Sequence, residues 1–409
     1  MAVLGLGYTV GMLTVEEALE QILGRTPVLE TESLDVTCAL GRVLAEPVVS
    51  TREIPPWPNS SMDGYAVRAA DTRVDAARLR VVGRIAAGAM PSRGVGSGEA
   101  MRIFTGAPLP EGADAVVPQE DVEAAGDVIG IATGVAKGAY VRARGEDVRQ
   151  GDRVLSPGQR LGPAEIGLLA TLGHSPVRVH RQPRVAILST GNELADLGTE
   201  PGPGQIPNAN TYSLRAQVTE AGAMPVNLGI APDRLEAIEE RLGWGSDADV
   251  VLSSAGVSVG ELDLVREALT RSGAELHLWR VSMRPGKPIT FGSWGRRLVF
   301  GLPGNPVSAM VTFELFVRPA LLRMGGRTVV ERPRLVARAR APIPNPGARR
   351  GYLRVRLARC DHGLEAELTG DQGSAILRSM TLADGLAVVA GDTTVAAGER
   401  VDVIPLREF

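Results

Sequence analysis

The chain has 409 residues, of which 44% are hydrophobic and 22% are charged, and its net charge is −3 at pH 7. This length exceeds one ordinary core, so we expect two to four domains. The near-neutral charge provides no general surface for polyanions, and an aromatic content of 4% disfavours stacking on single-stranded nucleic acid. We therefore expect no nucleic-acid partner.

The cysteines, the histidines and the first eight residues argue against a disulfide framework, a zinc site and a signal peptide or membrane span. Cys38 and Cys360 lie far apart without a CxxC pair, and the four histidines show no ligand spacing, so a disulfide framework or zinc site is not expected. Residues 1–8 are apolar but lack a basic region and contain glycine, so we expect neither a signal peptide nor a membrane span. These features predict a cytoplasmic protein.

The amino-terminal third mixes short helices with β-structure. Thr14 and Glu17 form a capping box that predicts a helix over residues 14–23, and residues 39–45 suggest a second short helical turn. Three prolines in residues 55–58 predict an extended connector that ends in a turn at Asp63. Short strands separated by glycine then predict a small β-module from about residue 81 to 140, before a helix over 163–172.

Strands and helices alternate from residue 183 to about 326. The predicted strands are 184–188, 226–230 and 250–252, and the predicted helices are 211–221, 232–242 and 262–271. This βαβ series indicates a parallel sheet with right-handed crossovers. Period-two alternation returns after residue 334, with Leu353, Val355 and Leu357 on one face and Tyr352, Arg354 and Arg356 on the other. The fold class is therefore α/β plus β, with a C-terminal β-module of about 75 residues.

Three of the predicted strands open into small turns that contain glycine. The segment 249–263 passes from a buried strand through the loop 253–260 into a helix, and 184–194 repeats the pattern. The third is 298–308, with a helix predicted from Val307 through Phe316. Open α/β sheets bind ligands beyond the carboxyl ends of their strands, where backbone N–H groups can hold an anion. Each turn alone fits a plain connection equally well, but three together predict a ligand site.

Carboxylates accompany these turns. Asp63, Glu193, Asp233 and Asp263 stand on or beside loops, and converging oxygens suit a hard cation such as Mg²⁺. Asp63 could equally be a plain turn residue.

Basic residues gather in the segment 284–288. Arg284 and Lys287 flank a Pro-Gly turn from which both could reach one oxyanion, and Arg354 and Ser374 could add donors. No Ser-His-Asp set and no Walker loop is present in the sequence. The residues alone thus predict metal-assisted group transfer on an anionic small molecule.

Eight motifs in chain order resemble the MoeA-type molybdopterin molybdenumtransferases, a family that includes the E domain of gephyrin. They are residues 61–67, 104–108, 144–147, 189–193, 256–260 with Asp263, 284–288, 301–306 and 372–374. The resemblance covers nearly the whole chain. It implies an enzyme that inserts molybdate into adenylylated molybdopterin and releases AMP and the molybdenum cofactor, with Mg²⁺ as cofactor.

The resemblance also implies an architecture and an assembly. The implied domains are a discontinuous connecting domain (1–57 and 148–182), an inserted β-rich domain (58–147), an α/β molybdopterin-binding domain (183–329) and a C-terminal β-barrel-like domain (330–409). It implies a homodimer whose subunits share an active-site cleft. Transient contact with a molybdopterin adenylyltransferase and with molybdoenzymes is implied as well.

The family motifs assign roles to individual positions. The catalytic polar residues would be Asp63, Thr105, Glu193, Asp233 and Asp263, with Glu193 and Asp263 on the metal. The substrate-binding residues would be Gly191, Gly256, Ser258, Gly260, Pro303, Gly304, Asn305 and Pro306. The molybdate pocket would comprise Arg284, Lys287, Ser308, Arg354 and Ser374.

Three positions depart from the family pattern. Arg284 stands where the family often has Lys, which keeps the charge but changes the contact geometry. Ala255 replaces a frequent Gly, and Asn192 replaces a common Asp, which weakens any metal-binding role for that side chain. The preference between molybdate and tungstate stays open.

Two other functions compete with this interpretation. An adenylyltransferase acting on molybdopterin would share the α/β domain, but it gives no reason for the β-modules. A non-catalytic scaffold that binds partner peptides is the second alternative. The retained set of carboxylates favours an enzyme over a scaffold.

Overall fold

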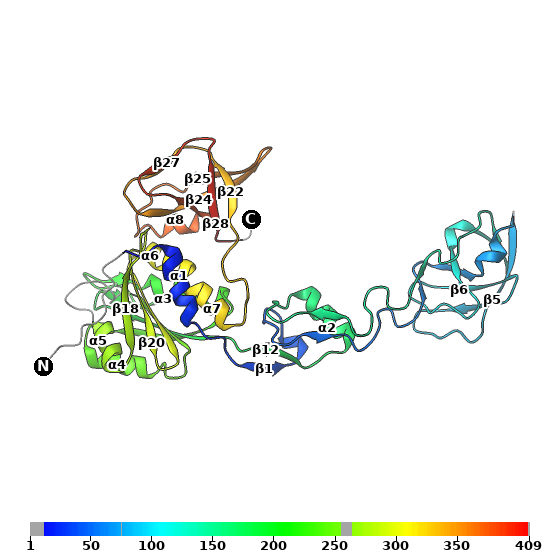
Figure 1. Cartoon of the computed structure of the whole chain (residues 1–409), viewed down its shortest axis with the longest axis horizontal. Helices are drawn as coiled ribbons and strands as arrows, with labels where there is room; N and C mark the ends of the chain where they lie inside the picture. The colour runs from blue at the N-terminus through cyan, green and yellow to red at the C-terminus, as the bar shows by residue number, and fades with distance from the viewer. Residues whose placement is uncertain (1–11, 75, 255–263, 408–409) are drawn as a thin grey trace. The chain divides into compact units, whose positions relative to one another are not determined.

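The computed structural model describes residues 12–74, 76–254 and 264–407, which divide into two compact units. The first unit comprises the described parts of 1–45, 158–162 and 176–409, and the second comprises 46–157 and 163–175. The elements of each unit are labelled in Figure 1. Among the described residues, none of the helices has the length and apolar character needed to span a membrane. The four-domain division is finer than these two units and stays a prediction.

A six-stranded sheet in the order β16-β13-β17-β21-β20-β18 forms the centre of the first unit. The parallel strands are β16 (Met224–Ala231), β13 (Arg184–Thr190), β17 (Val250–Ser254) and β21 (Arg297–Leu302). They confirm the predicted parallel sheet. β20 (Pro288–Trp294) and β18 (Glu275–Arg280) add an antiparallel edge that the sequence interpretation did not include.

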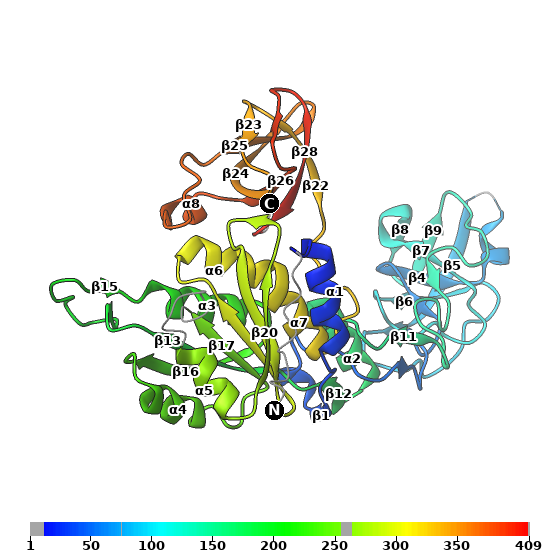
Figure 2. The same cartoon turned by 60° about the vertical axis from the view of Figure 1, so that its left-hand side comes forward.

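Helices cover both faces of this sheet (Figures 1 and 2). One face packs against α1 (Val15–Arg25), α3 (Ala209–Glu220), α6 (Pro306–Thr312) and α7 (Arg318–Met324). The other packs against α4 (Leu235–Gly243) and α5 (Leu264–Arg271). Burial on both faces explains the continuous apolar runs of the parallel strands. The helix expected to end at Phe316 instead continues through a π-helical turn, Phe313–Val317, into α7.

The start of the first unit confirms one prediction and corrects another. The capping box of α1 is present, with the Thr14 N–H donating to Glu17 Oε2 at 2.8 Å and the Glu17 N–H donating to Thr14 Oγ1 at 3.1 Å. The helical turn predicted over 39–45 is wrong. Val43 and Leu44 instead form isolated bridges to Arg160 and Val179, because long-range pairing satisfies their backbone groups. A short 3₁₀ turn lies earlier, at Val36–Cys38.

The C-terminal strands of the first unit close into a barrel. Its five strands pair in a ring, β24-β25-β22-β28-β26, because β26 also pairs with β24. They are β22 (Leu335–Ala339), β24 (Arg350–Cys360), β25 (Gly363–Leu368), β26 (Gly385–Val389) and β28 (Arg400–Pro405). Leu353, Val355 and Leu357 fill the barrel, whereas Tyr352 packs into the core with α1 and α7. The predicted β-barrel-like domain is confirmed, and both faces of β24 are buried near its start.

The second unit is built on another six-stranded sheet, in the order β7-β4-β6-β5-β9-β8. Its strands are β4 (Gly64–Val67), β5 (Ala77–Ile85), β6 (Glu99–Ile103), β7 (Ala115–Pro118), β8 (Val122–Ala125) and β9 (Val128–Ile131). Two apolar clusters line this sheet. The helix α2 (Pro163–Leu172) has the predicted bounds. The predicted β-module is confirmed, and β8 is an addition to it.

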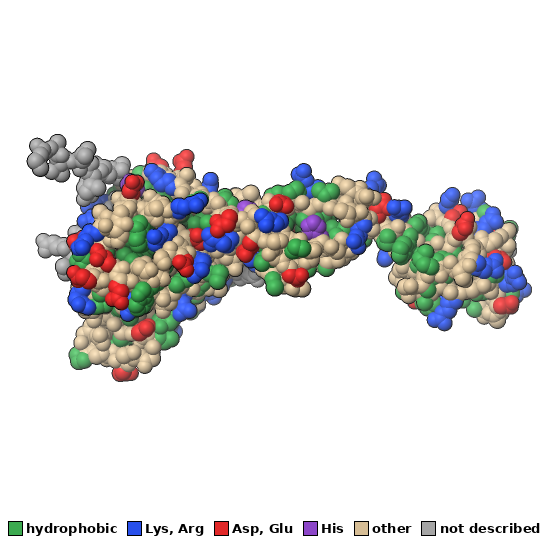
Figure 3. All heavy atoms as spheres, turned by 90° about the horizontal axis from the view of Figure 1, so that it is seen from below, with side chains coloured by type: hydrophobic (Ala, Val, Ile, Leu, Met, Phe, Trp, Pro, Cys, Tyr) green, Lys and Arg blue, Asp and Glu red, His purple; other side chains and the backbone are tan. Residues whose placement is uncertain are grey.

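Short elements complete both units. In the first they are β1 (Thr31–Leu34), β12 (Val177–His180), β14 (Leu194–Ala195), β15 (Ile206–Pro207), β19 (Met283–Arg284), β23 (Ile343–Asn345), α8 (Arg378–Thr381) and β27 (Thr393–Val395). In the second they are β2 (Val48–Val49), β3 (Asn59–Ser60), 3₁₀ turns at Ala69–Thr72 and Gln119–Asp121, β10 (Val141–Arg142) and β11 (Arg153–Leu155). Basic and acidic side chains are interspersed over the face of the first unit seen in Figure 3.

Candidate functional site

The loops after β13 and β16 are joined at the carboxyl edge of the parallel sheet. The Asn192 N–H donates to Asp233 Oδ2, and the Asp233 N–H donates to Asn192 Oδ1, both at 3.2 Å. This reciprocal pair fixes the two turns against each other. Asn192, which the sequence marked only as a departure from the family pattern, therefore has a structural role.

Gly191 shapes the turn that carries Glu193. Its φ of +140° lies outside the range that L-residues adopt readily, and a Cβ there would collide with the Glu193 carboxylate. The glycine thus lets the Glu193 side chain fold back over the turn. That carboxylate is exposed and makes no hydrogen bond or ion pair within the described part of the chain.

The ends of β17 and β21 are tied together by one side chain of α3. Asn210 Nδ2 donates to Ser254 Oγ and to the Gly304 carbonyl oxygen, each at 2.7 Å. These bonds hold the strand ends from which two predicted substrate loops leave. The predicted residues Gly256, Ser258, Gly260 and Asp263 lie outside the described residues.

The loop after β21 connects the sheet to the barrel. Pro303 and Gly304 lead to Asn305, which precedes α6, and Pro306 occupies the first helical turn. Asn305 Nδ2 donates to Ser374 Oγ at 3.1 Å, and the Val307 N–H donates to the Ser374 carbonyl oxygen at 3.1 Å. The barrel loop around Ser374 therefore lies at the start of α6. Ser308 is buried in the first turn of α6.

Arg354 is a fully buried cation beside this junction. Its Nε donates to Ser379 Oγ at 3.1 Å and its Nη2 donates to the Gly373 carbonyl at 3.0 Å. Nη1 is buried without a hydrogen-bond partner in the described structure. Burial, opposed by Asp371 and reinforced by Arg284, lowers the pKa of Arg354 to about 10, so the guanidinium stays charged at neutral pH. An incompletely bonded buried cation is costly unless something else pairs with it.

The basic turn adjoins the same strand. β19 pairs in parallel with β24, which sets Arg284 opposite Gly351. Arg284 Nη1 donates to the Pro346 carbonyl at 3.2 Å, and Lys287 is exposed. A Cβ on Gly286 would lie 2.5 Å from Thr312 Oγ1, so the turn packs tightly against α6. The structure thus brings Arg284, Arg354, Ser374 and Asn305 into one linked set of segments.

The second unit holds its own pair of predicted residues. The Thr105 N–H and Oγ1 both donate to Asp63 Oδ1, at 2.8 and 2.7 Å. They meet because β4 pairs antiparallel with β6, with Gly64 opposite Ile103. The hydrogen bonds from Thr105, with a smaller contribution from the Arg102 charge, hold the pKa of Asp63 below its ordinary value.

The described residues do not by themselves complete a metal site. No group of three or more His, Cys, Asp or Glu residues able to hold a metal ion occurs among them. Asp233 uses one carboxylate oxygen to accept the Asn192 N–H, whereas the Glu193 carboxylate at this edge has no described partner. The Mg²⁺ expectation therefore depends on Asp263 and on ligands from a substrate.

Sequence reasoning missed the residues that position others. Asn210 and Ser379 lie outside the motifs, and Gln372 lies in one without an assigned role, yet each holds a predicted segment in place. Gln372 Oε1 accepts from the Arg354 N–H at 2.8 Å, while its Nε2 donates to the Arg354 carbonyl at 3.2 Å. The one available signal was that Gln372 lies within a family motif.

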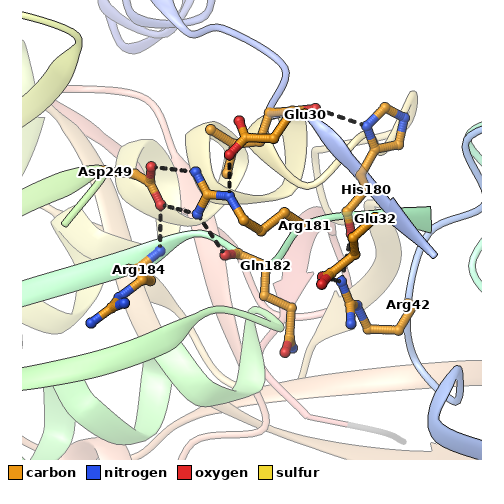
Figure 4. A network of polar contacts seen from close by, with 9 residues as sticks. Glu30, Glu32, Arg42, His180, Arg181, Gln182, Arg184 and Asp249 are labelled. Atoms are coloured by element: carbon orange, nitrogen blue, oxygen red, sulfur yellow. Dashed lines mark hydrogen bonds and ion pairs between the residues drawn. The ribbon is translucent and has the colours of Figure 1, made fainter. Parts of the chain in front are cut away.

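The amino end of the central sheet carries a different polar network (Figure 4). Arg181 donates through Nη1 and Nη2 to the two Asp249 oxygens, each at 2.8 Å, and through Nε to Glu30 at 2.6 Å. Asp249 also accepts from the Arg184 N–H at 2.8 Å. The Asp249 hydrogen bond is the main reason that the pKa of Arg181 is raised, so the guanidinium stays charged.

Three family models match most of the chain. Residues 13–173 match the MoeA N-terminal region (domain I and II), 186–323 match a probable molybdopterin binding domain, and 336–406 match the MoeA C-terminal region (domain IV). The three matches follow one another in the order that the sequence motifs indicated.

Full-length relatives and solved structures agree with these matches. The molybdopterin molybdenumtransferase of Nostoc sp. (strain PCC 7120) is 38% identical over 97% of this chain and 94% of its own length. That of Haemophilus influenzae is 35% identical over 97% and 100%. A crystal structure of the molybdopterin biosynthesis moeA protein from Pyrococcus horikoshii has a TM-score of 0.83 at 30% identity, over 96% of this chain and 99% of that one. The chain therefore belongs to the MoeA family of molybdopterin molybdenumtransferases.

Proposed function

We propose that this transferase inserts molybdate into adenylylated molybdopterin and releases AMP and the molybdenum cofactor. The observation that carries the proposal is Arg354, a buried cation with Nη1 unpaired, next to a barrel loop that is bonded to the start of α6. A tetrahedral oxyanion would supply the missing acceptor there. Molybdate is an anion of that kind, and charge-assisted hydrogen bonds to it would offset the cost of burying the arginine.

In this proposal the described residues bind and orient the two substrates. Arg354, Arg284 and Lys287 supply positive charge for molybdate, and Ser374 and Ser308 supply hydroxyl donors. We expect the turn from Pro303 to Pro306 to receive the phosphate of the pterin substrate through the N–H groups of Gly304 and Asn305, because the prolines have none and the Val307 N–H is bonded to Ser374. Asn210 and the Asn192–Asp233 pair keep the strand-end loops in register, so they act as positioning residues.

Mg²⁺ would neutralise charge on the substrate phosphate. Glu193 offers an open carboxylate for it, and we assign Asp263 as the second protein ligand. We expect Asp263→Ala to fold with an unchanged thermal midpoint and to lose Mg²⁺-dependent AMP release. Full activity of that variant would remove Asp263 from the site.

The proposal extends to assembly and location. We propose a homodimer in which the two subunits share the active-site cleft, working in the cytoplasm beside a molybdopterin adenylyltransferase and the molybdoenzymes that receive the cofactor. Asp63 and Thr105 would serve this shared cleft. Sedimentation equilibrium tests the dimer, and a monomer at working concentration would contradict it.

Reconstitution tests the reaction itself. The purified protein is mixed with adenylylated molybdopterin, molybdate and Mg²⁺, and AMP release is followed. AMP release that requires molybdate is the expected result. A parallel reaction with molybdopterin and ATP, analysed by mass spectrometry, distinguishes the adenylyltransferase alternative, because AMP transfer without molybdate would favour that enzyme. No product in either reaction would favour a scaffold.

A further inference from the structure

A cavity in the first unit is lined by none of the residues assigned to the molybdopterin or molybdate site. It has a volume of about 340 Å³ and lies where α3 and α7 end, against segments 40–43 and 180–183. Five arginines and one glutamate line it: Arg42, Arg160, Arg181, Arg318, Arg327 and Glu220. A volume of this size is at the lower end of ligand-binding pockets, so it suits a small molecule.

Most of these charges already have partners. Arg42 is bonded to Glu32 and to the His180 carbonyl, and Arg181 to Asp249. Arg318 Nη1 donates to the Val330 carbonyl at 3.4 Å, and Glu220 accepts from Arg332 at 3.1 Å. The Arg160 and Arg327 side chains, in contrast, have no hydrogen bond or ion pair with any described residue. The cavity therefore holds two cations without counter-charges.

The fold fixes the backbone on which Arg327 stands. α7 ends in a Schellman cap, in which the Gly326 N–H donates to the Arg323 carbonyl and the Arg327 N–H donates to the Leu322 carbonyl, both at 2.9 Å. Gly326 has a φ of +85°, and a Cβ there would collide with the His180 ring. Arg327 is thus the first residue after a rigid cap.

Arg160 is fixed from the other side of the cavity. Its backbone bridges to Val43, and its Nη2 lies 3.6 Å from the position that a Cβ on Gly41 would occupy. Burial and the Arg160 charge both lower the pKa of Arg327, which means that the two guanidinium groups repel each other. Cations often stabilise helix C-termini, but the Leu322 and Arg323 carbonyls are already satisfied by the cap.

We propose that Arg160 and Arg327 form a binding site for a small phosphate-bearing molecule, distinct from the molybdopterin site. Two adjacent guanidinium groups match a phosphate, which offers several acceptor oxygens and more than one negative charge. A bound phosphate would convert their repulsion into attraction. This proposal does not depend on the proposed reaction.

Isothermal titration calorimetry of the full chain with inorganic pyrophosphate tests the site. Wild-type protein is expected to bind, and Arg160→Gln and Arg327→Gln are each expected to weaken binding about tenfold or more, as loss of one charge-assisted contact predicts. Arg356→Gln, which changes an exposed arginine of the barrel, is the matched control and should bind as wild type does. Two other ligands are titrated in parallel. AMP tests whether the site prefers a nucleotide to inorganic phosphate, and succinate tests whether it prefers phosphate to carboxylate.

Several results would overturn the proposal. These are absence of pyrophosphate binding to the wild type, equal binding by the Arg160→Gln/Arg327→Gln double variant, or tighter binding of succinate than of either phosphate compound. A change of sedimentation coefficient in Arg160→Glu without any anion binding would assign the arginines to a contact between copies instead. Thermal unfolding of each variant establishes whether it is folded. If Arg327→Gln does not fold, the binding measurement on Arg160→Gln alone tests the proposal.

Discussion

Charged side chains near the amino end of the central sheet differ from those near its carboxyl end in whether they have partners. At the amino end, Asp249 receives two guanidinium hydrogen bonds and a backbone N–H, so the charges of Arg181 and Asp249 are paired (Figure 4). At the carboxyl end, Glu193 is open, and Arg354, beside the barrel loop that is bonded to the start of α6, keeps one unpaired nitrogen. Paired charges of the first kind stabilise the fold, whereas unpaired ones cost stability and are kept where a ligand completes them. The Arg181–Asp249 pair therefore serves stability, and the carboxyl end serves chemistry.

Arg354→Met should produce the largest effect on this comparison. The change removes a buried, incompletely paired cation, so the free energy of unfolding should change by less than about 2 kcal/mol in either direction. AMP release should fall about 100-fold, because charge-assisted hydrogen bonds to molybdate are worth about 1.5–3 kcal/mol each. Arg356→Met is the control for both measurements, because Arg356 lies on the same face two residues further along β24, where the side chain is exposed. Unaltered AMP release from Arg354→Met would remove the residue from the site.

Asp249→Asn should lower stability and leave activity unchanged. It weakens the bidentate contact with Arg181, so we expect the free energy of unfolding in urea to fall by about 2 kcal/mol, with the rate of AMP release unchanged. Asp402→Asn, whose carboxylate lies 3.8 Å from Arg334 in an exposed pair, should have almost no effect on stability. A loss of activity at full stability would contradict the division between the two ends.

Ser374→Ala sharpens the comparison at the junction of barrel and sheet. It removes the Asn305 side-chain contact but leaves the backbone bond from Val307 in place. We expect the half-saturating concentration of molybdate to rise about fivefold, as the loss of one hydrogen bond of about 1 kcal/mol predicts. Thr393→Val, which removes a hydroxyl contact elsewhere in the barrel, is the control. An unchanged molybdate dependence would mean that the Ser374–Asn305 contact does not contribute to molybdate binding.

Thr105→Val should give the smallest effect, measured as a titration. Because the hydrogen bonds of Thr105 depress the folded-state pKa of Asp63, they contribute stability above the ordinary aspartate pKa. That contribution is lost as the pH falls through the depressed value, so the window lies below about pH 4. Carboxyl ¹³C NMR should show the pKa of Asp63 moving up in the variant but not fully, since the backbone N–H still donates. An identical titration in both proteins would contradict this assignment.

The sequence predicted the parts of the fold that follow from local pattern. The parallel strands are buried on both faces and so appear as apolar runs, and their glycine-containing turns mark the carboxyl edge. The antiparallel edge was missed, because the pairing of β18 with β20 and of β20 with β21 is a tertiary choice. The extension of the helix beyond Phe316 was missed as well, and it includes a π-helical turn that no spacing rule predicts.

The candidate site was predictable only in part. Motifs identified Arg354 and Ser374, and period-two alternation placed Arg354 on the face opposite Leu353. Its burial could not be predicted, because it depends on the sheet and helices that cover that face near Tyr352. Asn210 was not predictable at all, since its contacts join residues 44 and 94 positions away in the chain.

The double variant Asp249→Asn/Arg354→Met tests the central claim most directly, with AMP release and the free energy of unfolding measured on the same preparation. Distant, independent sites have additive effects. The double variant should therefore show the rate of Arg354→Met, and its change in unfolding free energy should be the sum of the two single-variant changes. A rate that falls further through Asp249→Asn, or a stability loss from Arg354→Met greater than about 2 kcal/mol, would contradict the separation of the two ends.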